Sequence, residues 1–386
     1  MSTAEAAAYH VRELSSDNSN DSATHQPMLY ELILLQIPGL GPAARQRLIE
    51  RFDSLDRAFN ADARFWPIKL SADVVKQLNQ KNGDLFNKAS ACIQWCKTNL
   101  IHILTQDMED YPKNLRHIDA APFVLFAKGN LELLALPCIG IVGTRHPSQS
   151  GINTTRDFSK VLAGAGFCIV SGLAKGVDAI AHSAAMESEG STIAVLGTGI
   201  DKQYPHCNRA LYQHMDKTKQ LIISEFWPGT IPSPKNFPRR NRIISALSLG
   251  VLVTEAAVKS GSLVTARYAA EQGKEVFAVP GSIHNPMAKG CHHLINQGAR
   301  LIQDAHELVD GLRPQLETLA AEVKSIETAT VCPDSPLWQF IGYEPSDLDT
   351  LVAQSGLDVS QVLEALTLLE LDGVIACENG GYIRVK

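Results

Sequence analysis

The chain has 386 residues, a length that predicts two to four domains rather than one. Hydrophobic residues make up 45% and charged residues 20%, the balance of a globular protein with enough apolar surface for a core. No apolar run reaches the roughly 18 residues that cross a bilayer, so we expect no membrane span. The formal net charge of −6, from 35 basic and 41 acidic residues, argues by itself against a polyanionic partner.

The cysteines and the N-terminus predict a cytoplasmic protein. Eight cysteines are scattered without a Cys-x-x-Cys pair, far below the density of a disulfide-linked domain. No group of Cys and His has the spacing of zinc ligands, so we expect no metal and no cofactor. The first 27 residues lack the basic start and the apolar stretch of a secretory signal.

The N-terminal quarter of the chain predicts a tail and then a helical domain. Residues 1–26 are polar, and we expect them to be disordered. Residues 27–110 carry apolar side chains at helical spacing and predict a small all-helical domain. Its Pro38-Gly39-Leu40-Gly41-Pro42 segment predicts a tight turn between two helices and resembles a helix-hairpin-helix. Arg45 and Arg47 are candidates there for contact with a nucleic-acid backbone; a packing role is the alternative.

Residues 111–313 show the pattern of an α/β domain. Short apolar runs alternate there with segments long enough for a crossover helix. Runs of this kind, flanked by Gly, Ser or Pro, predict the buried strands of a mostly parallel sheet with helices on both faces. The predicted strands are 138–142, 167–170, 192–196, 221–224, 251–254 and 275–279.

The C-terminal region predicts a linker and a winged helix. Residues 314–336 are predicted as the linker. Two amphipathic helices at 346–354 and 359–371, with Gly356 as the stop between them, are followed by a hairpin around Asn379-Gly380-Gly381. Helix, turn, helix and hairpin over residues 337–386 together predict a winged helix-turn-helix.

Glycine-rich corners follow the first three predicted strands. They are Gly143-Thr144-Arg145, Ser171-Gly172-Leu173-Ala174-Lys175-Gly176 and Gly197-Thr198-Gly199. The carboxyl ends of parallel strands share one rim, where free backbone N–H groups and a cation bind anions such as phosphate. The alternative is an ordinary strand-to-helix turn with a surface cation. The sequence contains neither a dinucleotide-binding fingerprint nor a Walker A loop.

Asp178 and His182 lie four residues apart, on one face of the helix that follows the second corner. They are candidates for a base and the group that orients it. We favour the alternative, a local hydrogen bond that fixes the loop.

The fourth corner holds the densest group of basic residues in the chain. It contains Lys235, Phe237, Arg239, Arg240, Asn241 and Arg242, and no acid. Arginines with an interleaved aromatic suit a nucleic-acid backbone and an unstacked base. A solvated basic face is the alternative. The position of the group on the rim that carries Arg145 and Lys175 favours binding.

The fifth corner combines small hydroxyl residues with one acid. Ser260-Gly261-Ser262 is predicted to open a helix, with free N–H groups and hydroxyls facing an anion. Glu255 is a candidate catalytic residue, but we favour a role in pairing with an Arg or capping the helix. His292 and His293 diverge by about 100° on a helix, so we expect no shared metal ion.

These motifs, taken in order, resemble the DNA-processing protein A family (DprA, also called Smf). The resemblance rests on the corners above together with Ala181-His182, Tyr204-Pro205, Leu263-Val264-Thr265-Ala266 and Val279-Pro280-Gly281. It implies an extended Rossmann-like sheet, preceded by a helical SAM-like domain and followed by a winged-helix domain.

The resemblance also implies a function. It implies sequence-independent binding of single-stranded DNA, protection of the incoming strand and loading of the RecA recombinase during natural transformation, with no catalysed reaction. A homodimer through the Rossmann-like domain is expected. Carried over by position, the DNA-binding residues are Gly143, Thr144, Arg145, Ser171, Gly172, Lys175, Gly176, Phe237, Arg239, Arg240, Asn241, Arg242, Ser260, Gly261 and Ser262. The cations among them would hold phosphates, and Phe237 would stack on a base.

Two other functions stay open. Related α/β folds hydrolyse nucleoside monophosphates, and Glu225 or Glu255 is the candidate acid or base for such a reaction. The glycine-rich loop followed by Glu that these enzymes carry is missing from the sequence. The basic rim is also a candidate docking face for an acidic protein.

Charge is distributed unevenly along the chain. Residues 344–386 hold eight acids and two bases, a net −6, whereas residues 232–300 hold nine bases and three acids, a net +6. The second winged-helix helix carries Glu364 and Glu370 but no Lys or Arg, so phosphates would repel it. We therefore expect the winged helix to bind protein or regulate assembly, and its acidic residues to compete with DNA for the rim.

Overall fold

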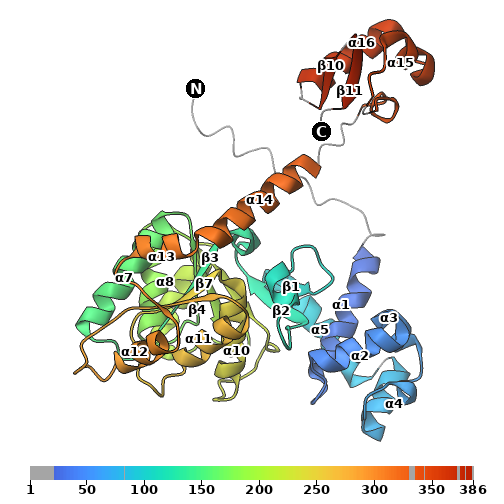
Figure 1. The fold of residues 1–386 in the computed structure, drawn as a ribbon. Coiled ribbons are helices and arrows are strands. Elements are labelled where there is room, and N and C mark those ends of the chain that lie inside the picture. The colour runs from blue at the N-terminus through green and yellow to red at the C-terminus, as the bar shows by residue number, and fades with distance from the viewer. Residues whose placement is uncertain are drawn as a thin grey trace. The chain divides into compact units, whose positions relative to one another are not determined.

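The computed structural model describes residues 21–81, 83–329, 335–342, 344–371, 374–378 and 380–384. The chain divides into two compact units, Met1–Leu312 and Arg313–Lys386 (Figure 1). No helix in the described ranges is long and apolar enough to cross a membrane.

The first unit begins with a group of short helices around one apolar core. These helices are α1 (Asp21–Gln36), α2 (Pro42–Phe52), α3 (Leu55–Asn60), α4 (Ala72–Gln80) and α5 (Asp84–Thr98), with a 3-10 turn at Ala63–Phe65. Tyr30 stacks on Phe59 with ring centroids 4.2 Å apart, and Trp66 meets Phe59 edge-on. The predicted turn and the start of α2 at Pro42 are confirmed.

The boundaries of this helical region differ from the prediction at both ends. Residues 21–26 were predicted as part of a disordered tail but belong to α1. The apolar second half of α1 is buried and stabilises the helix, which continues N-terminally over these polar residues. Residues 1–20 of that tail lie outside the described part of the chain. At the other end, the predicted helical domain ran to residue 110, but strand β1 (Ile101–Thr105) already lies within it. Its Ile101 and Ile103 join the core of the helices.

Arg45 is buried instead of exposed on the hairpin. Its Nε lies 2.6 Å from Glu31 Oε1, and its Nη2 lies 2.9 Å from Asp107 Oδ2 in the loop after β1. Burial raises the pKa of Glu31 to about 7 in spite of the arginine. Arg45 therefore ties the helices to the sheet, which is the packing role that the sequence left open.

A nine-stranded, mostly parallel sheet forms the centre of the unit. The strand order is β1-β2-β6-β5-β4-β3-β7-β8-β9, and only the pairings β1–β2 and β2–β6 are antiparallel. The remaining strands are β2 (Val124–Lys128), β3 (Cys138–Val142), β4 (Cys168–Ser171), β5 (Thr192–Leu196), β6 (Leu221–Ser224), β7 (Gly250–Val253), β8 (Glu275–Ala278) and β9 (Arg300–Leu301).

The predicted α/β class is confirmed, and all six predicted strands are present within one residue of their expected ends. Their near-continuous burial is what a sheet covered on both faces requires. Strands β1, β2 and β9 were not predicted. β1 and β2 form the antiparallel edge and share their apolar residues with the helical core, and β9 has only two residues.

Helices connect the parallel strands and cover the sheet. They are α7 (Gln149–Gly164), α8 (Val177–Glu187), α9 (Arg209–Lys217), α10 (Asn236–Leu247), α11 (Ser262–Glu271), α12 (Lys289–Asn296) and α13 (Ala305–Gly311). Shorter helical turns lie at Lys113–Arg116, Leu131–Ala135 and His206–Asn208. After β3 the chain passes to β4 on one side, while β7 pairs with β3 on the other. The order of the strands therefore reverses beside the carboxyl end of β3, the place where open α/β sheets bind ligands.

The second unit contains one long helix and a small winged-helix fold. Its elements are α14 (Arg313–Ala329), a 3-10 turn (Trp338–Phe340), α15 (Leu348–Ser355), α16 (Val359–Leu371), β10 (Ile375–Glu378) and β11 (Gly381–Arg384). Helix α14 occupies most of the segment predicted as a linker, whose residues 330–334 lie outside the described ranges. Gly356 ends α15 at a φ of 69°, as predicted. This unit has its own apolar core, which includes Leu351, Val362 and Leu366.

Candidate nucleic-acid interface

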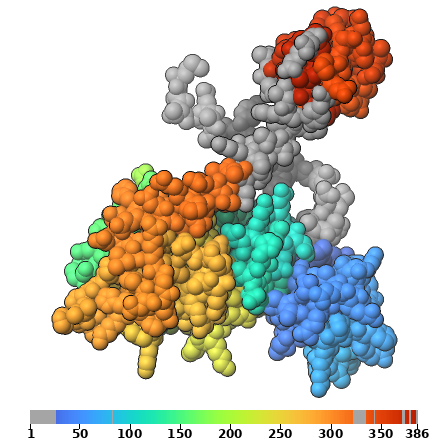
Figure 2. All heavy atoms as spheres, in the orientation of Figure 1, coloured from blue at the N-terminus to red at the C-terminus, as the bar shows by residue number. Residues whose placement is uncertain are grey.

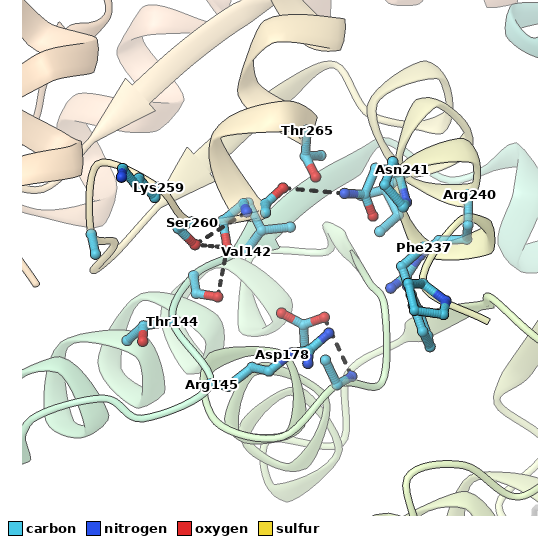
Figure 3. Close-up of a pocket in the computed structure, with 18 of the residues that line it drawn as sticks. Val142, Thr144, Arg145, Asp178, Phe237, Arg240, Asn241, Lys259, Ser260 and Thr265 are labelled. Atoms are coloured by element: carbon cyan, nitrogen blue, oxygen red, sulfur yellow. Dashed lines mark hydrogen bonds between the residues drawn. The ribbon is translucent and has the colours of Figure 1, made fainter. Parts of the chain in front are cut away.

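A cavity of about 730 Å³ opens beside the carboxyl ends of the central strands. Its walls come from the β3–α7 loop, the start of α10 and the β7–α11 loop (Figure 3). A second hollow of about 270 Å³ adjoins it, and both are lined by Arg145, His146, Ala174, Tyr204 and Phe237. Figure 2 shows the yellow-green and gold segments of this unit projecting into solvent.

Close backbone packing shapes the floor of the cavity. Gly176 has a φ of +86°, which disfavours a side chain, and a Cβ there would collide with the carbonyl oxygen of Thr144. The corners after β3 and β4 are thereby pressed together. The Ser262 hydroxyl donates to the carbonyl of Gly143 over 2.6 Å and joins the start of α11 to the same corner. The predicted glycine-rich corners thus meet in one site.

Two aromatic rings and one arginine form a stack between the two hollows. The Phe237 ring lies against Gly197, where an added Cβ would come within 2.7 Å of the ring. Tyr204 faces Phe237 with ring centroids 5.9 Å apart and 32° between their planes. The Arg145 guanidinium carbon lies 5.8 Å from the centroid of Phe237. This arrangement offers a planar apolar surface beside a cation.

Three exposed cations border the hollows. Arg145 and Lys259 line the larger one, and Arg145 and Lys175 line the smaller one. In the described part of the chain none of the three side chains forms an ion pair. They are therefore available to an anionic ligand.

Arg240 reaches the cavity but is buried, with 4% of its surface exposed. Its Nη1 donates to the carbonyl of Val195, and burial lowers its pKa to about 10. Asp178, which lies nearby, accepts from the backbone N–H groups of Gly172 and Ala174, and burial raises its pKa. Arg240 thus acts as an internal cation beside a buried carboxylate, and one of its donors, Nε, has no partner among the described residues.

The other two arginines of the basic group do not line either hollow. Arg242 is buried and donates to Glu225 over 2.5 Å, and Arg239 lies 3.0 Å from the same carboxylate oxygen. Burial raises the pKa of Glu225 even with two arginines beside it. The sequence motif therefore supplies a buried ion cluster as well as a binding surface.

The predicted serines and Asn241 hold the site together. Ser171 is buried and donates to the carbonyl of Ile141 over 2.6 Å. The Ser260 hydroxyl accepts from the backbone N–H of Ser262, and the Asn241 amide donates to the carbonyl of Gly261 over 3.3 Å. Asn241 therefore links α10 to the loop that precedes α11 (Figure 3).

The candidate catalytic groups have structural partners. Glu255 accepts from the backbone N–H of Ser148 and from the Asn285 amide, each over 2.8 Å, and so fixes the start of α7. Neither Glu255 nor Glu225 lines the cavity. Buried His182 bonds to the Thr192 hydroxyl over 2.6 Å, and burial lowers its pKa to about 3. His182 does not pair with Asp178. Asp178 fixes the loop after β4 without help from His182.

Nine of the 23 residues that line the main cavity are among the DNA-binding residues that the resemblance implies, and several others were missed. Tyr204 and Lys259 had no predicted role, although each follows a strand and lies on the predicted rim. His146 and Met287 also line the cavity. Met287 comes from the loop after β8, where the sequence offered no local signal.

Comparison with known proteins identifies the family. Residues 102–313 match the family model for DNA recombination-mediator protein A, and residues 332–381 match that for the DprA winged helix domain. The chain belongs to the DNA recombination-mediator protein A family. It is 40% identical to Protein Smf of Escherichia coli K12 over 304 residues, covering 78% of this chain and 81% of the relative. It is 46% identical to DNA processing protein DprA of Streptococcus pneumoniae over 201 residues, covering 52% of this chain and 70% of the relative.

Solved structures of this family show the same fold. DprA from Streptococcus pneumoniae matches at 36% identity and a TM-score of 0.59, covering 73% of this chain and 97% of that chain. DNA processing protein A from Helicobacter pylori, whose structure concerns its unique single-stranded DNA binding mode, matches at 31% identity and a TM-score of 0.51. That match covers 56% of this chain and 96% of that chain.

Proposed function

We propose that the chain binds single-stranded DNA without sequence preference, through the cavity at the carboxyl ends of the central strands. The observation that carries the proposal is the stack of Arg145, Phe237 and Tyr204 between two adjoining hollows. A planar apolar surface beside an unpaired cation suits an unstacked base and its phosphate. The match to a relative with a single-stranded DNA binding mode supports the same ligand.

The proposed contacts divide into ligands and supports. Arg145, Lys175 and Lys259 hold phosphates, while Phe237 and Tyr204 stack on bases. Two residues that the resemblance places among the DNA contacts, Ser171 and Arg242, are buried and line neither hollow, so we assign them a supporting role. Arg240 lines the main cavity, but we assign it a supporting role as well, because it is buried and bonded to Val195. Arg239 stays a weaker candidate ligand, because its guanidinium is half exposed but lies 3.0 Å from Glu225.

In the cell, we propose, the protein protects incoming single strands and loads the RecA recombinase during natural transformation. It acts in the cytoplasm as a homodimer through its Rossmann-like domain. Membership of the DNA recombination-mediator family supports the role in recombination. The protein catalyses no reaction, in keeping with the structural partners of Glu225 and Glu255.

The test is a titration of labelled oligo-dT, oligo-dA and a matched duplex over a salt series. The wild-type protein should bind both single strands more tightly than the duplex. Arg145→Ala should weaken binding to both single strands alike and flatten the plot of log K against log salt by about 0.7, the slope of one phosphate contact in a single strand. Lys217→Gln is the matched control, because Lys217 is exposed on α9 and lines no hollow described above. Unchanged affinity of Arg145→Ala would refute the proposed site.

A further inference from the structure

A third hollow continues from the candidate DNA cavity along the side of α11. It has a volume of about 680 Å³ and lies between α11, β8 and α12, of which α11 and α12 are labelled in Figure 1. Lys259 and Ser260 line both this groove and the main cavity. The loop that carries them is thus a common wall, over which a ligand can pass from one hollow to the other.

The groove combines an apolar floor with a basic margin. Its floor includes Leu263, Ala266, Ala270, Val276 and Leu294, and its margin carries Lys259, Arg267, Lys274 and His293. Glu275 is the one acid that lines it. Apolar surface bordered by cations matches a single strand, whose bases are apolar on their faces and whose backbone is anionic.

Two of the cations are free to take a new partner. The amine of half-buried Lys274 has no ion pair among the described residues, and burial lowers its pKa. A phosphate beside this amine would offset the cost of burying its charge. Arg267 pairs with Glu271 over 3.5 Å, but both side chains are more than half exposed, so the pair contributes little.

We propose that this groove is a second subsite for the same DNA strand, with Arg267 and Lys274 holding phosphates beyond the Val258–Ser260 loop. The inference rests on the proposed function and extends it. Helix α11 has 10 residues, which gives the groove a length of about 15 Å at 1.5 Å per residue. A strand that leaves the main cavity past Lys259 therefore meets a further apolar floor and two cations.

Continuity with the main cavity favours a strand over a protein ligand. The two hollows share Lys259 and Ser260, and the main cavity also presents unpaired Arg145. A protein segment docked in the groove would not require the groove to be continuous with the main cavity. Contact with protein instead of DNA is an outcome that the experiment distinguishes.

The experiment compares full-length wild-type protein with the double variant Arg267→Gln/Lys274→Gln on labelled oligo-dT of increasing length. For the shortest oligomer that the wild type binds, the variant should have the same affinity. For longer oligomers the wild type should gain affinity and the variant should not. Its salt slope on the long oligomers should be flatter by about 1.4, or about 0.7 for each lost phosphate contact. Lys217→Gln serves again as the control for the loss of a surface charge.

The results separate this inference from the proposed function. Loss of the affinity gain on long oligomers, with unchanged affinity for the shortest one, supports the second subsite. If the double variant binds DNA of every length as the wild type does, the second subsite is overturned and the main cavity is unaffected. If, in addition, the sedimentation coefficient of the variant differs from that of the wild type, the groove is assigned to contact between protein chains. Equal loss at all lengths also overturns the second subsite, because the groove would then act only through the main cavity. Failure of Arg145→Ala to weaken short oligomers concerns the proposed function alone.

Discussion

Replacement of Arg240 by Ala separates a supporting arginine from a DNA ligand. Arg240 lies in the basic motif that the family resemblance assigns to phosphate contact, yet its guanidinium is buried against the carbonyl of Val195. Asp178 is buried in the same region, and Arg240 is the largest cationic influence on its pKa. Removal of Arg240 leaves this carboxylate without its main counter-charge. The two side chains form no ion pair, so the cost is that of the lost buried hydrogen bond to Val195 and the weaker charge compensation, about 1–3 kcal/mol of unfolding free energy.

The expected signature has a stability part and a binding part. Arg240→Ala should lower the unfolding free energy by about 1–3 kcal/mol in chemical denaturation, and by less at acid pH, where Asp178 takes up a proton. Its salt slope for oligo-dT should stay at the wild-type value. Arg145→Ala should do the reverse, with near wild-type stability and a slope flatter by about 0.7.

Gly172→Ala provides an independent perturbation of the same arginine. A Cβ on Gly172 would collide with the Arg240 guanidinium and force it from its position. The variant should therefore lose stability as Arg240→Ala does. The reasoning fails if Arg240→Ala is as stable as the wild type and flattens the salt slope by about 0.7, because Arg240 would then be a phosphate ligand.

Three further predictions concern other parts of the molecule. Phe237→Ala should weaken single-strand binding by about 1–3 kcal/mol in anisotropy titrations without changing the salt slope, because stacking releases no counterions; a flatter slope would contradict this. The pKa of His182 is about 3 in the folded protein, against 6.5 for an exposed histidine, so only the unfolded chain takes up this proton between these two pH values. Stability should therefore fall as pH falls below 6.5, by about 2 kcal/mol at pH 5, and His182→Gln should lack this part of the decline in denaturation midpoints. The isolated winged helix, residues 337–386, should show no gel shift with duplex or single-stranded DNA at ordinary salt; strong binding would restore a DNA-reading role for α16.

The strands and their corners could be predicted because a buried parallel strand gives a simple sequence pattern, a short run of apolar residues. Each of the runs around 138–142, 192–196 and 221–224 is apolar throughout and flanked by small residues, so its ends were found within one residue. The shared rim follows from the parallel arrangement alone. β1 and β2 left a weaker trace, because their apolar residues belong partly to the core of the helices.

The roles of individual arginines could not be predicted in this way. Residues 239–242 lie within α10, where successive side chains diverge by about 100°, so four consecutive residues point in four directions. Arg240 and Asn241 line the cavity, whereas Arg239 and Arg242 meet Glu225 on another side. Glu225 follows β6 and lies outside the basic group, so the sequence of that group gives no sign of its partner.

Net charge predicts a partner only after charges with internal partners are removed. The nine bases of residues 232–300 include buried Arg240 and Arg242, and Arg239 shares Glu225, a residue outside the range that was counted. In the described part of the winged helix, Arg384 lies 4.2 Å from the Trp338 ring and is held within its own fold. The main cavity and the smaller hollow together retain three unpaired cations among the described residues, which predict a salt slope of about −2 for a strand confined to these two hollows. A slope near −3.5 on longer strands would require the two further cations of the groove along α11.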